Sequence, residues 1–110
     1  MNQYQVHITD TAYADMEKLY EHIAYVLMSP GNALNQYNRI ADAILTLAFL
    51  PERHSLFEEE PEKTLGIHKM IVDNYVICYV IDPAVVTVTD IIYGASDLHS
   101  KLKQRHSSLS

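Results

Sequence analysis

The sequence predicts an α+β fold in which an N-terminal strand and an antiparallel helix hairpin precede a three-strand antiparallel meander and a short C-terminal tail. Three observations support this prediction. A short alternating segment opens the chain, two segments with helical periodicity follow, and three β-rich runs come last, separated by only two or three turn-forming residues. Strands joined by such short links can pair only in the antiparallel sense.

The first half of the chain predicts one strand and two helices. Residues 3–8 alternate between apolar and polar side chains, which is typical of a half-buried strand. Residues 9–11 supply side-chain oxygens that cap a helix start, and residues 12–27 then carry one apolar stripe at helical spacing. Ser29-Pro30 is typical of a second helix start, and Pro51 ends that helix. The short break predicts a helix hairpin packed on one face of a sheet that also contains the first strand.

The second half predicts a loop, three strands and a tail. Residues 52–63 have no periodicity and carry five glutamates, so we expect an exposed loop. Residues 94–110 begin in a turn and can form one short helix through Leu98 and Leu102, with residues 106–110 frayed. The chain thus reads as one domain over residues 1–105. The three predicted strands are residues 65–72, 75–81 and 85–92.

Composition is that of a globular protein of a reducing compartment. Of the 110 residues, 48% are apolar and 20% are charged, and no stretch approaches the roughly 20 apolar residues of a membrane span. The N-terminus lacks the basic and apolar regions of a signal peptide. Cys78 is the one cysteine, so no internal disulfide can form, and its strand position predicts a small buried thiol. These features predict a cytoplasmic protein without a membrane segment.

The charge distribution is unusual for a nucleic-acid binder. The formal net charge is −6, whereas phosphate binding usually needs a basic face. Residues 52–63 carry five glutamates against one arginine and one lysine, a net charge of −3. From residue 94 onward, one aspartate stands against three basic residues, a net charge of +2. The basic tail permits an anionic partner there without requiring one.

Specific residues in the last strands resemble the RelE/ParE toxin superfamily. In that family pattern a basic residue opens the strand, a tyrosine follows the turn and a second tyrosine comes four residues later; Tyr75 and Tyr79 occupy those positions in the run 67–82. At the end of the last strand the family has a glycine and an aspartate that bracket two residues, and Gly94 and Asp97 match them. The segment AYADMEKLYEHIAYV and the end of the second helix at Leu50-Pro51 also resemble the family pattern. The resemblance therefore covers about 100 residues.

The resemblance implies the toxin of a type II toxin–antitoxin pair. Members of the superfamily either cut messenger RNA on the ribosome or poison DNA gyrase, and a protein antitoxin wraps and blocks them. The leading hypothesis is a RelE-like ribosome-dependent mRNA endonuclease with an atypical site. The alternatives are a ParE-like gyrase poison and a degenerate toxin that keeps only protein binding. If charge complementarity governs antitoxin binding, the inhibitory segment should be less acidic than is common, and even basic.

Several positions depart from the family pattern. The strand position that family members often fill with arginine holds His68, with Lys69 beside it, and Ala95 and Ser96 stand where two further arginines are common. Cleavage of RNA by its own 2′-hydroxyl needs a base, an acid and fixed cations at the developing phosphorane. The sequence offers few cations for that task.

The candidate catalytic residues are His68, Lys69, Tyr93 and His99. Alternation along the strand puts His68 and Lys69 on opposite faces, where the structural alternatives are a half-buried edge histidine and a lysine with an exposed head group. Tyr93, at a strand end, can donate a proton, stack on a base or simply pack, and His99 is either a titrating group or a surface histidine.

Other polar residues favour structural roles. Arg53 and His54 lie in the acidic loop, where the glutamates compete for any cation, and Asp97 after a turn is typical of a helix cap. The six histidines lack metal-ligand spacing, so we expect neither a metal site nor a cofactor.

Overall fold

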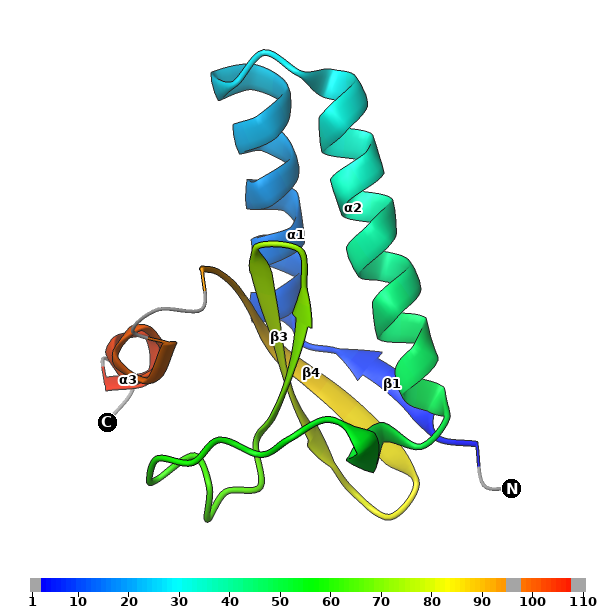
Figure 1. The fold of residues 1–110 in the computed structure, drawn as a ribbon, viewed down its shortest axis with the longest axis vertical. Helices are drawn as coiled ribbons and strands as arrows, with labels where there is room; N and C mark the ends of the chain where they lie inside the picture. The colour runs from blue at the N-terminus through cyan, green and yellow to red at the C-terminus, as the bar shows by residue number, and fades with distance from the viewer. Residues whose placement is uncertain (1–2, 95–97, 108–110) are drawn as a thin grey trace.

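The computed structural model describes residues 3–94 and 98–107. Two short 3₁₀ turns, Thr46–Ala48 and Pro51–Arg53, follow the second helix. The order of the elements confirms the predicted α+β architecture (Figure 1). The main elements are β1 (Gln5–Ile8), α1 (Asp10–Glu21), a π-helical turn (His22–Val26), α2 (Pro30–Leu45), β2 (His68–Val72), β3 (Tyr75–Ile81), β4 (Val85–Tyr93) and α3 (Leu98–Ser107).

The four strands form one sheet in the order β1-β4-β3-β2. The antiparallel pairs β2–β3 and β3–β4 confirm the predicted meander, and β1 joins the same sheet parallel to β4. Asp73 adopts a left-handed conformation with φ of 55°, as a two-residue hairpin turn requires. The β3–β4 register shifts at Thr89, which lies between the residues paired with Cys78 and Tyr79.

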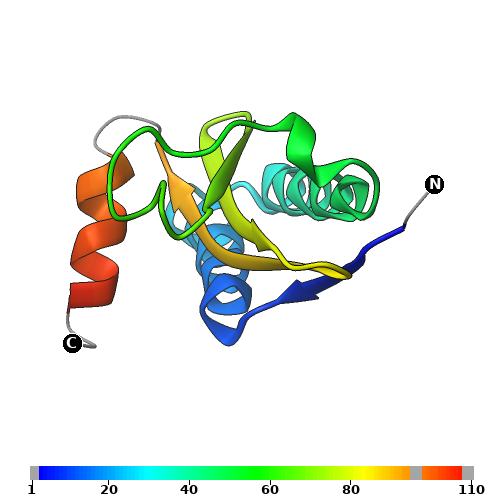
Figure 2. The same ribbon diagram turned by 90° about the horizontal axis from the view of Figure 1, so that it is seen from below.

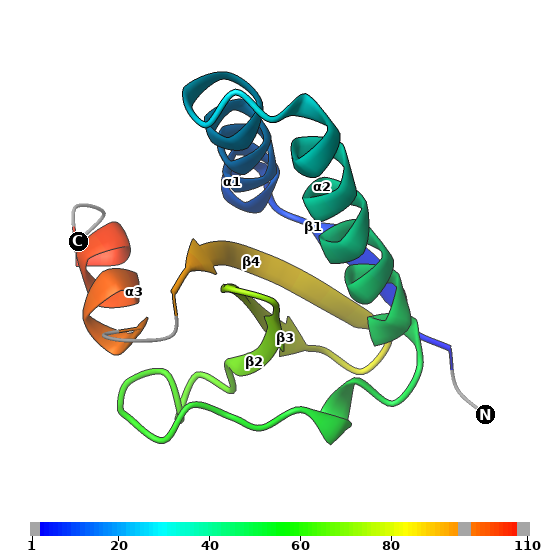
Figure 3. The same ribbon diagram turned by 45° about the horizontal axis from the view of Figure 1, so that its top comes forward.

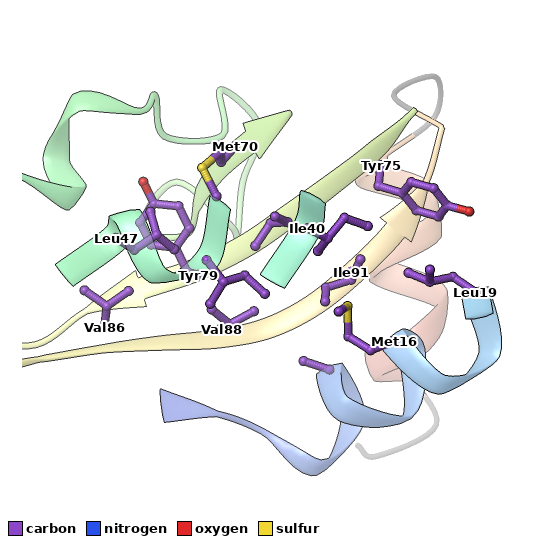
Figure 4. Close-up of a cluster of buried hydrophobic side chains, with 13 residues drawn as sticks. Met16, Leu19, Ile40, Leu47, Met70, Tyr75, Tyr79, Val86, Val88 and Ile91 are labelled. Carbon is purple, nitrogen blue, oxygen red and sulfur yellow. The ribbon is translucent and has the colours of Figure 1, made fainter. Parts of the chain in front are cut away.

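The helix hairpin covers one face of the sheet, as predicted. The Thr9 hydroxyl caps α1 by accepting a hydrogen bond from the Ala12 amide at 3.2 Å. Tyr75 and Tyr79 both face this layer and belong to its core, and Tyr79 is fully buried (Figure 4). The other core side chains include Met16, Leu19, Ile40, Ile44, Leu47, Met70, Ile77, Val86, Val88 and Ile91.

The second face of the sheet is covered at one end by α3 and by the segment that precedes β2. Views from below and with the top tilted forward show α3 on the side away from the helix hairpin (Figures 2 and 3). This second core is small and consists of Phe57, Val76, Cys78, Ile92, Leu98 and Leu102. Cys78 is fully buried in it, which confirms the predicted thiol environment.

The prediction of an exposed loop over residues 52–63 holds at most positions but is wrong at Phe57 and Glu62. Phe57 and Glu62 are only 2% and 3% exposed, because the segment folds back over the second face of the sheet. It also pairs with the edge of β2 through hydrogen bonds from the Phe57 amide to the Ile67 carbonyl and from the Lys69 amide to the Ser55 carbonyl. Because the chain turns through residues 59–66, β2 begins at His68, three residues after the predicted strand start.

The short helix predicted through Leu98 and Leu102 is present as α3. Leu98 and Leu102 anchor α3, which extends to Ser107, two residues past the predicted domain end. Residues 108–110 of the predicted frayed end lie outside the described residues. Within the part of the chain that the structure describes, no helix is long and apolar enough to cross a membrane.

Candidate functional site

His68 lies on the helix-facing side of β2. Its ring stacks on that of Tyr79, with centroids 5.2 Å apart and planes 13° apart. Its Nδ1 lies 2.7 Å from the carbonyl oxygen of His54, so Nδ1 carries the hydrogen and donates it. These contacts give His68 a packing role.

Tyr93 lies at the opposite end of the sheet. Its side chain is 65% exposed and meets the Tyr75 ring edge-on, with centroids 5.3 Å apart. Its backbone carbonyl accepts a hydrogen bond from Lys101 Nζ at 2.9 Å. Tyr93 is therefore accessible, and the two cavities that it lines in the described part of the chain do not include His68.

Lys69 and His99 come together on the second face of the sheet. Both line a cavity of about 290 Å³, here called the His99 cleft, whose other lining residues include Phe57, Glu59, Ile71 and Ser100. The Lys69 ammonium lies 5.4 Å above the centre of the Phe57 ring, a cation–π contact. The structure thus brings together two of the four candidates and leaves His68 and Tyr93 elsewhere.

Glu62 does not line this cleft but contacts His99, which does. Its side chain is 4% exposed, and its Oε1 accepts a hydrogen bond from His99 Nδ1 at 2.7 Å. Its Oε2 is buried and has no hydrogen-bond partner among the described residues. Because Nδ1 donates to the carboxylate, His99 presents Nε2, the atom that can accept or release a proton. A histidine oriented by a buried carboxylate can act as an acid or a base, and Lys69 can attract an anion beside it.

Nothing in the sequence singles out Glu62. It stands in an acidic run, which is typical of a solvated surface, and its partner lies 37 residues further along the chain. A second group that sequence reasoning missed is the buried carboxylate pair of Asp15 and Asp90. Arg105 of α3 donates to both, with distances of 2.9 Å and 2.8 Å from its Nη1.

Of the remaining polar candidates, Arg53 is engaged in hydrogen bonds, whereas the buried Nε2 of His54 has no hydrogen-bond partner among the described residues. Arg53 donates hydrogen bonds to the carbonyl oxygens of Phe49 and Leu50. Both residues lie in the segment that follows α2. The neighbouring His54 is half-buried; burial, then the charges of Arg53 and His68, lower its pKa below the usual value. Ala95, Ser96 and Asp97, which the family comparison singled out, lie outside the described residues.

The described residues offer neither a cluster of metal ligands nor a reactive thiol. Among residues 3–94 and 98–107, no three histidine, cysteine or acidic side chains cluster as metal ligands would. Burial raises the pKa of the Cys78 thiol to about 12, so it is not a nucleophile near neutral pH.

Comparisons with known proteins identify the fold and the family of this chain. The fold is similar to a toxin–antitoxin structure described as the chromosomal ParDE TA system from P. aeruginosa, with 18% identity, a TM-score of 0.70, and coverage of 84% of this chain and 97% of that one. It is also similar to a chain of the RelBE2 toxin–antitoxin complex from Mycobacterium tuberculosis, with 24% identity, a TM-score of 0.54, and coverage of 87% and 97%. This is the RelE/ParE fold of type II toxins.

The family model described as the ParE toxin of the type II toxin–antitoxin system parDE matches residues 6–98, and the chain belongs to this family. No curated protein matches it significantly.

Proposed function

We propose that this ParE-family toxin acts by binding a protein target, DNA gyrase, and that a protein antitoxin neutralises it in the cytoplasm. The observation that carries the proposal is the family match over residues 6–98, since the resemblance drawn from the sequence connects ParE toxins with gyrase poisoning. The antitoxin partner is supported by the two similar structures, both of which are described as toxin–antitoxin systems.

The arrangement of basic side chains supports a protein-binding poison over a nuclease. Arg39 and Arg105 are engaged by carboxylates, and Arg53 by backbone carbonyls. The His99 cleft contains one lysine as its cation, beside the carboxylate of Glu59. A cleft of this charge offers little stabilisation to a pentacoordinate phosphorane, whereas gyrase inhibition makes no such demand.

The test is inhibition of gyrase by the purified full-length chain. Supercoiling of relaxed plasmid should fall as toxin is added, and prior mixing with the product of the neighbouring gene should restore it. Ribosome-bound messenger RNA, mapped by primer extension, should remain uncut at the same toxin concentration. Unimpaired supercoiling would contradict the proposal. If the RNA also stays intact, the chain is a protein-binding module that has lost toxicity.

A second candidate function is a ribosome-dependent mRNA endonuclease, and one specific observation favours it. The buried Glu62 orients His99 beside Lys69, which is the arrangement of a positioned acid–base catalyst next to a phosphate-attracting charge. In this hypothesis His99 Nε2 exchanges the proton, Lys69 binds the scissile phosphate, and Glu62 positions the imidazole.

The second candidate is tested by His99→Gln, with the exposed His7→Gln as the matched control. If the cleft cuts RNA, His99→Gln should lower ribosome-dependent cleavage by about 10²–10⁴-fold, the range for loss of one acid–base group, and His7→Gln should not. Equal cleavage by both variants would exclude His99 as the catalyst.

A further inference from the structure

The tip of the helix hairpin exposes large apolar side chains to water. Tyr25, Val26, Leu27 and Met28 close the hairpin and are 73%, 67%, 59% and 83% exposed, and Leu34 near the start of α2 is 52% exposed. These five side chains are here called the tip patch. The hairpin reaches past the end of the sheet, so the sheet does not cover its tip (Figure 1). Exposed apolar patches of this kind mark interaction surfaces.

The tip patch is large enough for a specific contact with a second copy of the chain. A large side chain has a surface of roughly 200 Å², and the five exposures average about two thirds, so about 650 Å² of mostly apolar surface faces water. Two copies that cover each other's patch remove about 1,300 Å² from water, which lies within the range of about 1,200–2,000 Å² for specific interfaces.

The hairpin tip contains no acidic residue, lysine or arginine. Residues 22–38 are free of all four residue types, whereas the whole chain has 14 acidic and eight basic residues and a net charge of −6. The nearest charged residues on either side, Glu21 and Arg39, have opposite signs. Different proteins usually select each other by complementary charge, whereas homodimer interfaces are more apolar and have few charges at their core. The composition of the tip therefore fits a second copy better than a charged partner.

The tip also lies where two acidic copies repel each other least. The molecule is 40 Å long, with the tip at one end of its longest axis and the acidic segment 52–63 at the other (Figure 1). Two copies joined at their tips therefore hold these segments much further apart than the Debye length of about 8 Å. A contact near residues 52–63 would instead bring together two segments of net charge −3 each.

The polar side chains of the tip can pair with copies of themselves. Asn32, Asn35 and Asn38 are exposed on α2, and each amide has both a donor and an acceptor. In a two-fold interface the same surface faces itself, so a charged group near the axis meets its own like charge, whereas an amide meets a matching partner. The tip is therefore self-complementary in its polar residues as well as in its apolar ones.

Met28 keeps an apolar side chain where the backbone favours glycine. Its φ of 54° lies in the left-handed region, and the next amide, that of Ser29, donates to the Ile23 carbonyl at 3.0 Å. Glycine is the usual residue at such a helix end because it has no Cβ. The side chain that stands there is the most exposed of the patch, and methionine adapts readily to apolar partners. This position therefore favours contact over easy chain closure.

We propose that the tip patch is a self-association surface through which two copies of the antitoxin-free toxin pair about a two-fold axis. The middle of the exposed segment, Val26 and Leu27, lies close to this axis, and the amides of α2 surround it. The inference goes beyond the proposed function, because it requires neither gyrase nor the antitoxin.

Sedimentation equilibrium of the purified full-length chain tests the proposal. Across about 1–100 μM, a range in which interfaces of this size associate, the unsubstituted chain should change from monomer to dimer. Val26→Glu adds a charge on both sides of the interface and should raise the dimer Kd about 100-fold, which is tenfold for each copy. Leu65→Glu is the matched control, since Leu65 is 64% exposed and lies in the turn before β2, and it should dimerise like the unsubstituted chain.

Two further variants separate contact from folding. Met28→Gly relieves the left-handed backbone but removes a contact, so its dimer Kd should rise about tenfold while its monomer unfolds at no lower a urea concentration than the unsubstituted chain. Mixing Val26→Glu with Val26→Lys should restore the dimer that each variant lacks alone, because opposite charges then meet at the axis. If the mixture stays monomeric, the two-fold arrangement is wrong.

The remaining outcomes also decide the proposal. A chain that stays monomeric up to about 100 μM overturns it, and equal dimerisation of Val26→Glu and Leu65→Glu places the interface elsewhere. If the chain is monomeric and Val26→Glu loses binding to the neighbouring gene's product, the tip belongs to that partner and the proposal is overturned. A tip-dependent dimer that leaves supercoiling unimpaired would contradict gyrase inhibition and support self-association, so the two proposals can fail separately.

Discussion

Replacing Arg105 by glutamine should destabilise the protein strongly, because the substitution removes a cation from between two buried carboxylates. The guanidinium of Arg105 lies between Asp15 and Asp90, whose side chains are 5% and 1% exposed. Without it, the two buried carboxylates lose the guanidinium that bridges them. Breaking a buried ion pair in this way usually costs about 3–5 kcal/mol.

We expect a value near the lower end, about 3 kcal/mol, because the Arg105 side chain is itself 31% exposed and water can replace part of its interaction. Asp15 also keeps its hydrogen bond from the Ile91 amide. The assay is urea unfolding followed by circular dichroism. With an m-value of about 1.5–2 kcal/mol/M for a domain of this size, the midpoint should fall by about 1.5–2 M.

Two further variants identify the cause. Arg39→Gln removes an arginine from an exposed pair with Asp73 and should unfold close to the wild-type midpoint. Adding Asp90→Asn to Arg105→Gln removes one of the two stranded charges and should restore part of the lost stability. A midpoint for Arg105→Gln equal to that of the wild type would refute the argument, and a double variant less stable than the single one would exclude charge repulsion as the reason.

Three other predictions concern the core and the surface. Tyr79→Phe removes the hydroxyl that donates to the buried Pro51 carbonyl at 2.6 Å and should cost about 1–2 kcal/mol in urea unfolding. Because burial raises the pKa of Cys78 to about 12, its thiol should react with a disulfide reagent at pH 8 only as fast as the protein unfolds; rapid labelling of the native chain would contradict this. The hydrogen bonds from Arg39 hold the pKa of Asp73 below its ordinary 3.8, so this pair contributes stability above about pH 4 that disappears as the pH falls through the lowered pKa. As the pH falls below about 4, the wild type should therefore lose more stability than Arg39→Gln, and parallel profiles would rule this out.

The parts of the fold that were predictable have strong local signals. The alternation along the strand correctly put His68 and Lys69 on opposite faces, because side chains of a strand alternate whatever packs against them. The two-residue turn at Asp73 determined the hairpin register for a similarly local reason, since turn length sets which residues pair.

The site was not predictable because its contacts are long-range. Glu62 and His99 are 37 residues apart, and Arg105 and Asp15 are 90 apart, so no spacing rule links them. The acidic run around Glu62 has the composition of a solvated loop, yet Glu62 itself is buried and contacts His99 of α3. With only two leucines at helical spacing, α3 itself had a weak signal.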